Sequence, residues 1–293
     1  MALTVVFDQR MQAPAEGFSP SAAKPALVVA AWERTGLPMD VVPPEPATLD
    51  ELARAHDRAY VEAVLAGRWA NGFGTRDPAV ARSLPYTTGA MLTGARLSAL
   101  TGLPVCAPVS GFHHAGWDSG GGFCTFNGLM VTALAVLAEG SADRVVIIDC
   151  DQHYGDGTDE ILDHLGKPGS IHHFTAGKYF RHRQHIVRFF RRLEEELAEL
   201  REGDLVLYQA GADPHVRDPL GGWMGDAELR HRDEMVFEGV KAAGVPLVWN
   251  LAGGYQRDDT GGIGPVIAIH TRTALEHLRV FDGWTERSSS PAT

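Results

Sequence analysis

The sequence has 293 residues, 44% of them hydrophobic, which is enough for one large α/β domain with a full apolar core. Asp and Glu (37) outnumber Lys and Arg (26), so the formal net charge is −11. This acidic balance argues against general nucleic-acid binding. The apolar stretch 25–32 is too short to cross a bilayer, so we expect no interaction with a membrane.

The cysteines and the N-terminus both indicate where the protein works. Three cysteines, Cys106, Cys124 and Cys150, cannot all pair, and none has the CxxC spacing of a zinc site. We expect them to be buried, reduced thiols. No basic region precedes a hydrophobic stretch at the N-terminus, so we expect no signal peptide and a cytoplasmic protein.

Apolar runs typical of strands alternate with helical periodicity along almost the whole chain. In chain order, strands are expected at 3–7, 103–109, 144–148, 170–174, 205–209 and 246–251. Helices are expected at 22–33, 49–65 (capped by Thr48), 88–99, 129–139, 158–165, 185–202, 228–243 and 264–278. This alternation predicts one α/β domain, with a parallel sheet sandwiched by helices, over residues 1–287. The tail 288–293 is expected to be disordered.

The most informative segment is DCDQHYGDGT, residues 149–158, which directly follows the predicted strand 144–148. Asp151 and His153 can point the same way from an extended chain, because side chains alternate with a period of two. A carboxylate oxygen and an imidazole nitrogen that converge there suit a divalent metal such as zinc. Asp149 and Asp156 remain, and a carboxylate behind a catalytic imidazole would fix its tautomer and tune its basicity.

Three further polar segments also follow predicted strands. His113 and His114 are adjacent, and two imidazoles beside a metal can divide general-base and general-acid duties. Asp213 would complete a shell of two carboxylates and one imidazole, which leaves a metal position open. The glycines before Tyr255 permit a turn that could present its hydroxyl to a developing oxyanion. Because ligands of parallel sheets gather at the carboxyl ends of the strands, we expect one composite site.

Taken together, these segments resemble the histone deacetylase and acetylpolyamine amidohydrolase family, which has the arginase/deacetylase fold. The residues that carry the resemblance are His113-His114, the DxDxH pattern at 149–153, Gly211-Ala212-Asp213 and Gly253-Gly254-Tyr255. The GGYQ form at 253–256 is most similar to class IV deacetylases and their bacterial relatives. Residues 51–61 also look like the N-terminal helix of that family. The resemblance implies a zinc-dependent deacetylase whose substrate is an acylated amine.

The resemblance also implies a role for each site residue. The zinc ligands would be Asp151, His153 and Asp213. His114, backed by Asp156, would act as general base and then as general acid. His113, backed by Asp149, would give electrostatic support. Tyr255 would polarise the acyl carbonyl and stabilise the tetrahedral oxyanion.

Two more features follow from the family pattern. The family binds potassium near the zinc, and the matching residues are Asp149, Asp151, His153, Ser170 and Ile171. The acyl-lysine tunnel would be lined by Gly122, Phe123 and Leu220. The chain between Phe174 and Leu205 is much shorter than in typical deacetylases, so one wall of the tunnel should differ.

Two other functions stay open at this point. A non-catalytic module could bind an acyl ligand in the same pocket, although it would have no need of both His114 and Tyr255. A two-manganese ureohydrolase of the arginase type would need further aspartate ligands, in DxHxD and DxDxxDP patterns, that the sequence lacks. The sequence also leaves open the choice between zinc and ferrous iron, the substrate, the preferred acyl chain and the oligomeric state.

Overall fold

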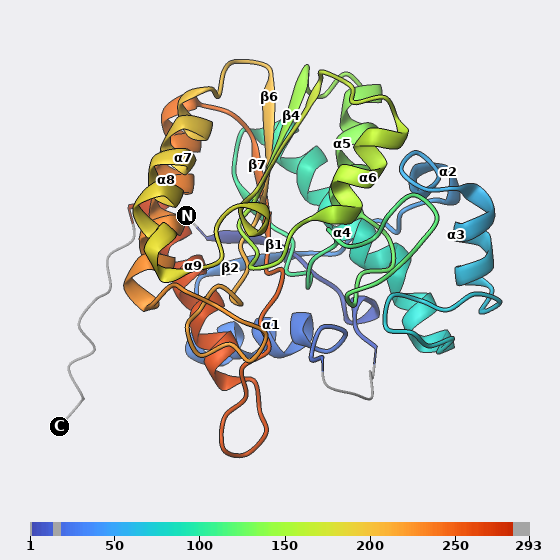
Figure 1. Cartoon of the computed structure of the whole chain (residues 1–293), viewed down its shortest axis with the longest axis horizontal. Coiled ribbons are helices and arrows are strands. Elements are labelled where there is room, and N and C mark those ends of the chain that lie inside the picture. Colours follow the sequence, from blue (N-terminus) through green and yellow to red (C-terminus); the bar gives the residue numbers. More distant parts are fainter. Residues whose placement is uncertain (1, 14–18, 284–293) are drawn as a thin grey trace.

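A seven-stranded sheet, parallel throughout, runs through the centre of the molecule (Figure 1). The computed structural model describes residues 2–13 and 19–283, so the predicted disordered tail 288–293 lies outside the described residues. The strand order is β2-β1-β3-β7-β6-β4-β5. The strands are β1 (Leu3–Val6), β2 (Met39–Val42), β3 (Val105–Cys106), β4 (Arg144–Asp149), β5 (Ile171–Thr175), β6 (Asp204–Gln209) and β7 (Leu247–Asn250).

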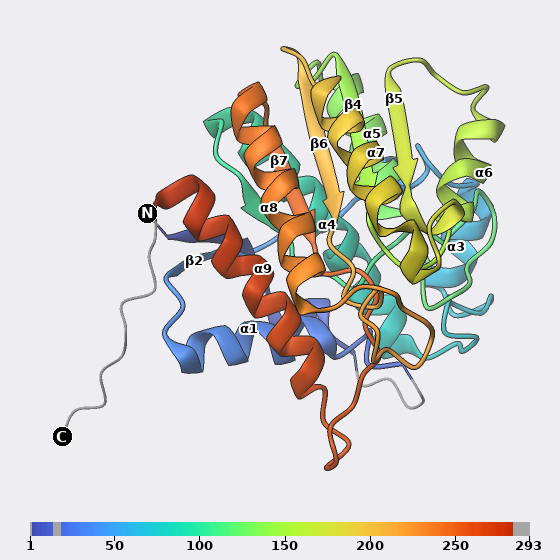
Figure 2. The same cartoon turned by 60° about the vertical axis from the view of Figure 1, so that its left-hand side comes forward.

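Helices cover both faces of this sheet. One layer contains α7, α8 and α9, with α1 packed against α9, and the other contains α4, α5 and α6 (Figures 1 and 2). The α-helices are α1 (Lys24–Thr35), α2 (Leu49–Leu52), α3 (Arg58–Leu65), α4 (Pro78–Thr101), α5 (Gly128–Ala138), α6 (Asp156–His164), α7 (Ile186–Ala198), α8 (Asp226–Ala243) and α9 (Gly264–Asp282). Short 3-10 turns are η1 (Gln9–Met11), η2 (Ala176–Lys178) and η3 (Arg183–His185).

Strand β7 shows why the central strands are apolar throughout. The Trp249 ring lies 6.3 Å from that of Trp32 in α1 and 6.0 Å from that of Phe237 in α8. The neighbouring Val248 points to the other face, where its Cγ2 would lie 2.8 Å from a Cβ added at Gly94 of α4. Because successive side chains of a strand face opposite sides, a sheet with two helical layers needs apolar residues at every position.

The predicted α/β architecture is confirmed, and all six predicted strands are present. The prediction of one helix over 49–65 is wrong. The chain instead forms α2, with Thr48 as its cap, and then α3, capped by Asp57. Strand β2 was not predicted, because its side chains lie half-buried or exposed at the sheet edge and form no buried apolar run.

The prediction of buried, unpaired cysteines is confirmed. The three cysteines are unpaired and buried. Within residues 2–13 and 19–283, no helix combines the length and the hydrophobicity that a membrane span requires.

The helix predicted at 88–99 is longer than expected, since α4 begins at Pro78 and continues through Pro85.

Candidate active site

The four polar segments meet because the strands that carry them are neighbours. In the sheet these strands lie in the order β3-β7-β6-β4, and all are parallel, so their carboxyl ends share one edge. The segment after β3 holds His113 and His114, and the loop after β4 holds Asp151 and His153. The loops after β6 and β7 hold Asp213 and Tyr255.

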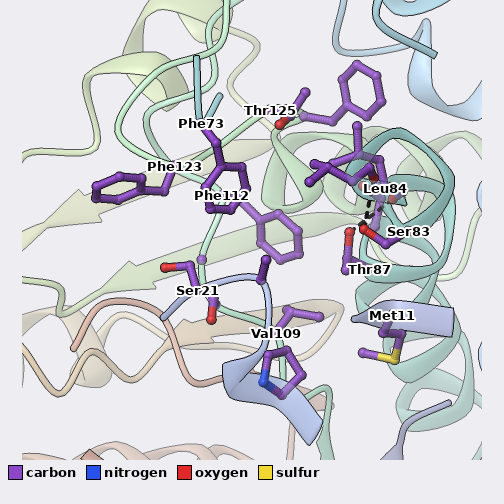
Figure 3. Close-up of a pocket in the computed structure, with 17 residues that line it drawn as sticks. Met11, Ser21, Phe73, Ser83, Leu84, Thr87, Val109, Phe112, Phe123 and Thr125 are labelled. Atoms are coloured by element: carbon purple, nitrogen blue, oxygen red, sulfur yellow. Dashed lines mark hydrogen bonds between the residues drawn. The ribbon is translucent and has the colours of Figure 1, made fainter. Parts of the chain in front are cut away.

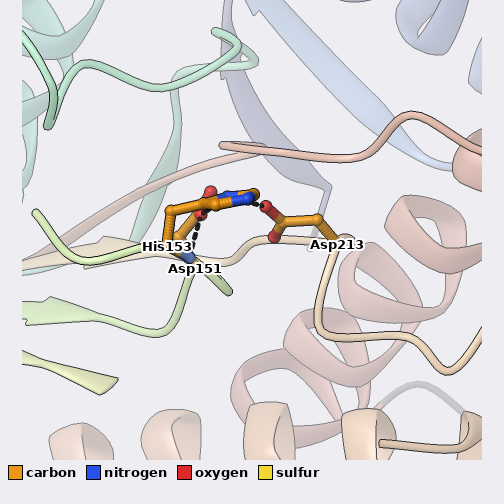
Figure 4. Close-up of side chains that lie close together, drawn as sticks. All are labelled: Asp151, His153 and Asp213. Carbon is orange, nitrogen blue, oxygen red and sulfur yellow. Dashed lines mark hydrogen bonds and ion pairs between the residues drawn. The ribbon is translucent and has the colours of Figure 1, made fainter. Parts of the chain in front are cut away.

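Asp151, His153 and Asp213 form a compact cluster whose side-chain atoms could bind a metal ion (Figure 4). One ligand atom from each lies within 4.8 Å of the others. Nδ1 of His153 is the atom that faces both carboxylates, at 3.2 Å from Asp151 Oδ1 and 3.0 Å from Asp213 Oδ2. Main-chain amides fix the carboxylates from behind, since Gly253 N donates to Asp151 Oδ2 (2.8 Å) and Gln152 N donates to Asp213 Oδ1 (3.2 Å).

The charges of this cluster fit a divalent cation. Asp213 is fully buried, and burial next to the negative charge of Asp151 raises the pKa of the Asp213 carboxyl. Burial opposes the protonation of His153, but hydrogen bonds to the two carboxylates raise its pKa to about 11. Gly253 keeps the adjoining space open, because a Cβ there would lie 2.3 Å from Asp213 Oδ2 and 2.6 Å from Asp151 Oδ2. Two carboxylates and one imidazole are a donor set that suits zinc or ferrous iron.

Each imidazole of the His-His pair has its own carboxylate. Nδ1 of His113 lies 2.7 Å from Asp149 Oδ2, and Nδ1 of His114 lies 2.6 Å from Asp156 Oδ1. The two ring centres are 4.3 Å apart. Burial opposes the charged form of His113, but Asp149 and Asp151 raise its pKa to about 9. Burial, together with the neighbouring His113, lowers the pKa of His114, so the second ring favours the neutral, basic form.

Tyr255 lies at the same edge, in the turn after β7. Its residue is 7% exposed, and its ring centre lies 5.8 Å from that of Phe123. Burial, followed by the negative charges of Asp213 and Asp151, raises the pKa of the Tyr255 phenol far above its usual range. The hydroxyl therefore keeps its proton and can donate a hydrogen bond.

The structure does not bring the predicted potassium ligands together. Ile171 pairs with Val145 in the sheet, whereas Asp149 pairs with Thr175, four residues further along β5. Four residues of strand span about 13 Å, so Ser170 and Ile171 lie at the end of β5 away from Asp149. The prediction that these two residues share a potassium ion with Asp149 is wrong. The side chain that lies against the Asp149 carboxylate from β5 is His173.

The predicted channel residues lie at two places around the site. Phe123 adopts a left-handed conformation (φ 67°), and its ring lies between those of Phe73 and Tyr255, at 5.8 Å from each. Gly122 lies against the His114 ring, since a Cβ there would be 2.4 Å from His114 Cδ2. Leu220 is 40% exposed, in the loop after β6. We therefore interpret Leu220 as a residue at the outer rim of the predicted channel.

An apolar cavity is lined partly by residues 109–112 and by residues 123, 125 and 126, which flank the His-His segment in sequence (Figure 3). The other lining residues come from η1, α1, α4 and the segments at 21–22 and 73. Its lining is mostly aromatic and aliphatic, with hydroxyl groups interspersed, from residues such as Phe73, Leu84, Val109, Ser21, Ser83 and Thr87 (Figure 3).

Three supporting residues were missed by the sequence analysis. Gln209 donates from Nε2 to Asp149 Oδ1 (2.8 Å), and Asp218 accepts the main-chain amide of Tyr255 (2.8 Å). Lys24 is completely buried and donates to the main-chain oxygen of Ala252, which has a left-handed φ of 55°. Burial lowers the pKa of Lys24 to about 8 against the attraction of three nearby aspartates. A buried strand that ends in Gln, or a Lys before an apolar run, is the only signal the sequence offers.

The fold is similar to that of a protein of known structure. The crystal structure of the HDA15 HD domain superposes with a TM-score of 0.73 and covers 96% of each chain at 22% identity. Among curated proteins, an uncharacterised protein of Picosynechococcus sp. is 33% identical over 196 residues, and histone deacetylase 2 of Arabidopsis thaliana is 28% identical over 188 residues. The acetoin utilization protein AcuC of a Staphylococcus aureus strain is 30% identical over 227 residues.

Residues 20–180 match the histone deacetylase domain, which is more than half of the chain. The chain belongs to the histone deacetylase and acetylpolyamine amidohydrolase family. The alignments with the three curated relatives cover 61%, 58% and 62% of this chain, and 64%, 49% and 57% of the relatives' own lengths.

Proposed function

We propose that this chain is a metal-dependent amidohydrolase that removes an acetyl or other acyl group from an amine, such as acetyl-lysine or an acetylpolyamine. The observation that carries this proposal is the convergence, at one edge of the sheet, of the Asp151–His153–Asp213 cluster with two imidazole–carboxylate pairs. Membership of the histone deacetylase family supports the same chemistry. Zinc is the proposed ion, with ferrous iron as the alternative that the same ligands accept.

The chain's own groups divide the reaction between them. A zinc ion held by the cluster would supply Lewis acidity for the acyl carbonyl and for a water molecule. Asp156 holds the proton of His114 on Nδ1, which leaves Nε2 as the base that takes a proton from the attacking water. The same nitrogen then protonates the departing amine. The Tyr255 hydroxyl donates a hydrogen bond to the oxyanion of the tetrahedral intermediate.

His113 plays a different part because of its partner. Its Nδ1 is bound to the fully buried Asp149, and its Nε2 lies 3.7 Å from Asp151 Oδ1. Asp149 favours the protonated ring, so His113 places positive charge beside the reacting carbonyl instead of taking up a proton.

A direct test loads the purified chain with zinc or with ferrous iron. Acetyl-lysine peptide, acetylpolyamine and trifluoroacetyl-lysine are offered as substrates, together with longer acyl chains, and acetate or fatty acid release is measured. We expect hydrolysis of at least one of these amides. The Asp213→Asn variant should lose both bound metal and activity, whereas Asp258→Asn, in an exposed loop, should keep both.

Other outcomes would identify the competing functions. Stoichiometric zinc with tight acyl-ligand binding and no product release would indicate a non-catalytic binding module. Two manganese ions per chain would indicate a ureohydrolase. Within the part of the chain that the structure describes, Asp151, His153 and Asp213 are the single group of candidate ligands whose atoms lie within 4.8 Å of one another. This favours one ion.

A further inference from the structure

His173 is a buried histidine that the proposed mechanism does not use. It lies on β5, and its side chain is 1% exposed. Its Nδ1 lies 2.8 Å from Asp159 Oδ1, at the start of α6, and its Nε2 faces Asp149 Oδ2 at 3.8 Å. The Nε2 atom is buried and has no hydrogen-bond partner in the structure. A buried polar atom that points at a carboxylate without a hydrogen bond calls for an explanation.

The surroundings of Asp149 show what the imidazole replaces. The Asp149 carboxylate is completely buried, and its oxygens accept from His113 Nδ1 (2.7 Å), Gln209 Nε2 (2.8 Å) and the Asp151 amide (3.1 Å). A buried carboxylate needs compensating positive charge, and the His113 ring supplies one such charge to Asp149. The family pattern adds potassium as a second, but the strand register places the predicted ligands Ser170 and Ile171 too far away.

The turn at 153–155 packs against the Asp149 carboxylate beside the His173 imidazole. Gly155 N donates to Thr175 Oγ1 (3.0 Å), which fixes the turn to β5. A Cβ on Gly155 would lie 2.7 Å from Asp149 Oδ2 and 3.2 Å from His173 Nε2. The turn, the carboxylate and the imidazole are therefore in contact with one another.

The positions of the two ring nitrogens of His173 determine its protonation. Each nitrogen faces a carboxylate oxygen, Asp159 on one side and Asp149 on the other, and a carboxylate only accepts. A hydrogen on each nitrogen makes both contacts attractive, so we assign the ring as an imidazolium. Asp159 stays ionised because it also accepts from Lys178 Nζ (2.8 Å) and Tyr154 OH (2.5 Å).

We infer that His173 takes the place of the potassium ion in this chain, and that its imidazolium holds Asp149 in position behind His113. His173 is a positioning residue, because it acts through Asp149 and touches no reacting atom. The order Asp159, His173, Asp149, His113 links the start of α6 to the catalytic pair. The chain should therefore need no monovalent cation.

The test compares three forms of the zinc-loaded protein in potassium chloride and in choline chloride at equal ionic strength. Wild type should have the same melting temperature and the same deacylation rate in both salts. His173→Ala should melt lower and lose about tenfold or more in kcat/KM in choline, and potassium should restore part of both. The control is His172→Ala, since His172 is the next residue on β5, is 37% exposed and pairs instead with Glu196 of α7 (2.6 Å).

Two results would overturn the inference. One is a wild type that melts lower and slows down when choline replaces potassium. The other is a His173→Ala protein that matches wild type in both salts. If the alanine variant does not fold, His173→Gln keeps a hydrogen-bond donor without the charge and should show the same response to potassium. Because melting needs no turnover, the absence of deacylase activity would count against the proposed function and leave this test intact.

Discussion

The position of the Tyr255 phenol depends on three neighbours that hold its turn from different directions. Asp218 accepts its main-chain amide, Lys24 binds the oxygen of Ala252 three residues earlier, and Phe123 packs against its ring. Gly254, between them, has a φ of 148°, which an L side chain rarely adopts. These contacts hold the turn in place before any substrate binds, as the proposed role of Tyr255 as an oxyanion donor requires.

Replacing Tyr255 with Phe tests this role with the smallest change. We expect kcat to fall about 10²- to 10³-fold, because one preorganised donor to the oxyanion is lost. Zinc content, measured by atomic absorption, should stay at one per chain, since Tyr255 is not a ligand. The matched control is Tyr179→Phe, whose side chain is exposed on the surface. An unchanged rate for Tyr255→Phe would remove this residue from the mechanism.

His56 gives the protein a specific sensitivity to acid. The ring is completely buried, its Nδ1 donates to the Gly116 oxygen (2.8 Å), and its Nε2 accepts the Asn127 amide (2.8 Å). Burial lowers the pKa of His56 to about 4, against an ordinary value of 6.5. In the unfolded chain the ring takes up a proton near pH 6.5, but the folded chain does so only near pH 4. Stability is therefore lost as the pH falls through this interval.

The loss attributable to His56 is on the order of 3 kcal/mol between pH 6.5 and 4. We expect His56→Gln, which can still donate and accept, to flatten the dependence of unfolding free energy on pH by up to about 1.4 kcal/mol per pH unit. Urea titrations of the metal-free protein at pH 7, 6 and 5 measure this slope without interference from zinc release. The exposed His182→Gln serves as control. Equal slopes for wild type and His56→Gln would refute the assignment.

At the scale of elements, the sequence predicts buried strands better than it predicts where a helix is interrupted. The buried strands β4, β6 and β7 were predicted to within a residue or two, because apolar runs bounded by polar residues report burial directly. The break between α2 and α3 was missed because it depends on the contacts of His56 with segments 116–117 and 127, some sixty or more residues away. Periodicity carries no information about such distant partners.

Helix α4 shows a close approach that only glycine allows. A Cβ on Gly89 would lie 2.0 Å from the Glu45 oxygen and 2.8 Å from the Ala47 nitrogen, both backbone atoms. We expect Gly89→Ala to destabilise the fold by about 1 to 3 kcal/mol, because the helix must move away from segment 45–47. Chemical denaturation measures the change. The control, Gly169→Ala, adds a methyl group where nothing lies within 4 Å, so its stability should match wild type. Equal stabilities for Gly89→Ala and wild type would contradict this packing.

At the scale of the whole molecule, the site arises from the strand order. The proposed ligand and acid–base residues could be picked out because each follows an apolar run, but the neighbour order β3-β7-β6-β4 brings together segments up to about a hundred and forty residues apart. The prediction of Ser170 and Ile171 as potassium ligands was wrong because it depends on which residues of β5 pair with β4. This register cannot be deduced from the sequence alone. Pairing between strands, rather than local pattern, decides which polar residues meet.

The same arrangement predicts how the protein responds when the proposed metal ion is removed. The proposed ligands lie in loops beyond β4 and β6, while the apolar core lies between the sheet and its helices, so chelation should lower stability without removing secondary structure. With free zinc at 100 to 1,000 times its dissociation constant, the bound ion stabilises the fold by about 3 to 4 kcal/mol. Melting followed by circular dichroism, with zinc and with chelator, should show a lower melting temperature and an unchanged helical signal at 20 °C. Asp213→Asn should melt at one temperature in both conditions. A wild type indifferent to chelator would mean that Asp151, His153 and Asp213 hold no ion.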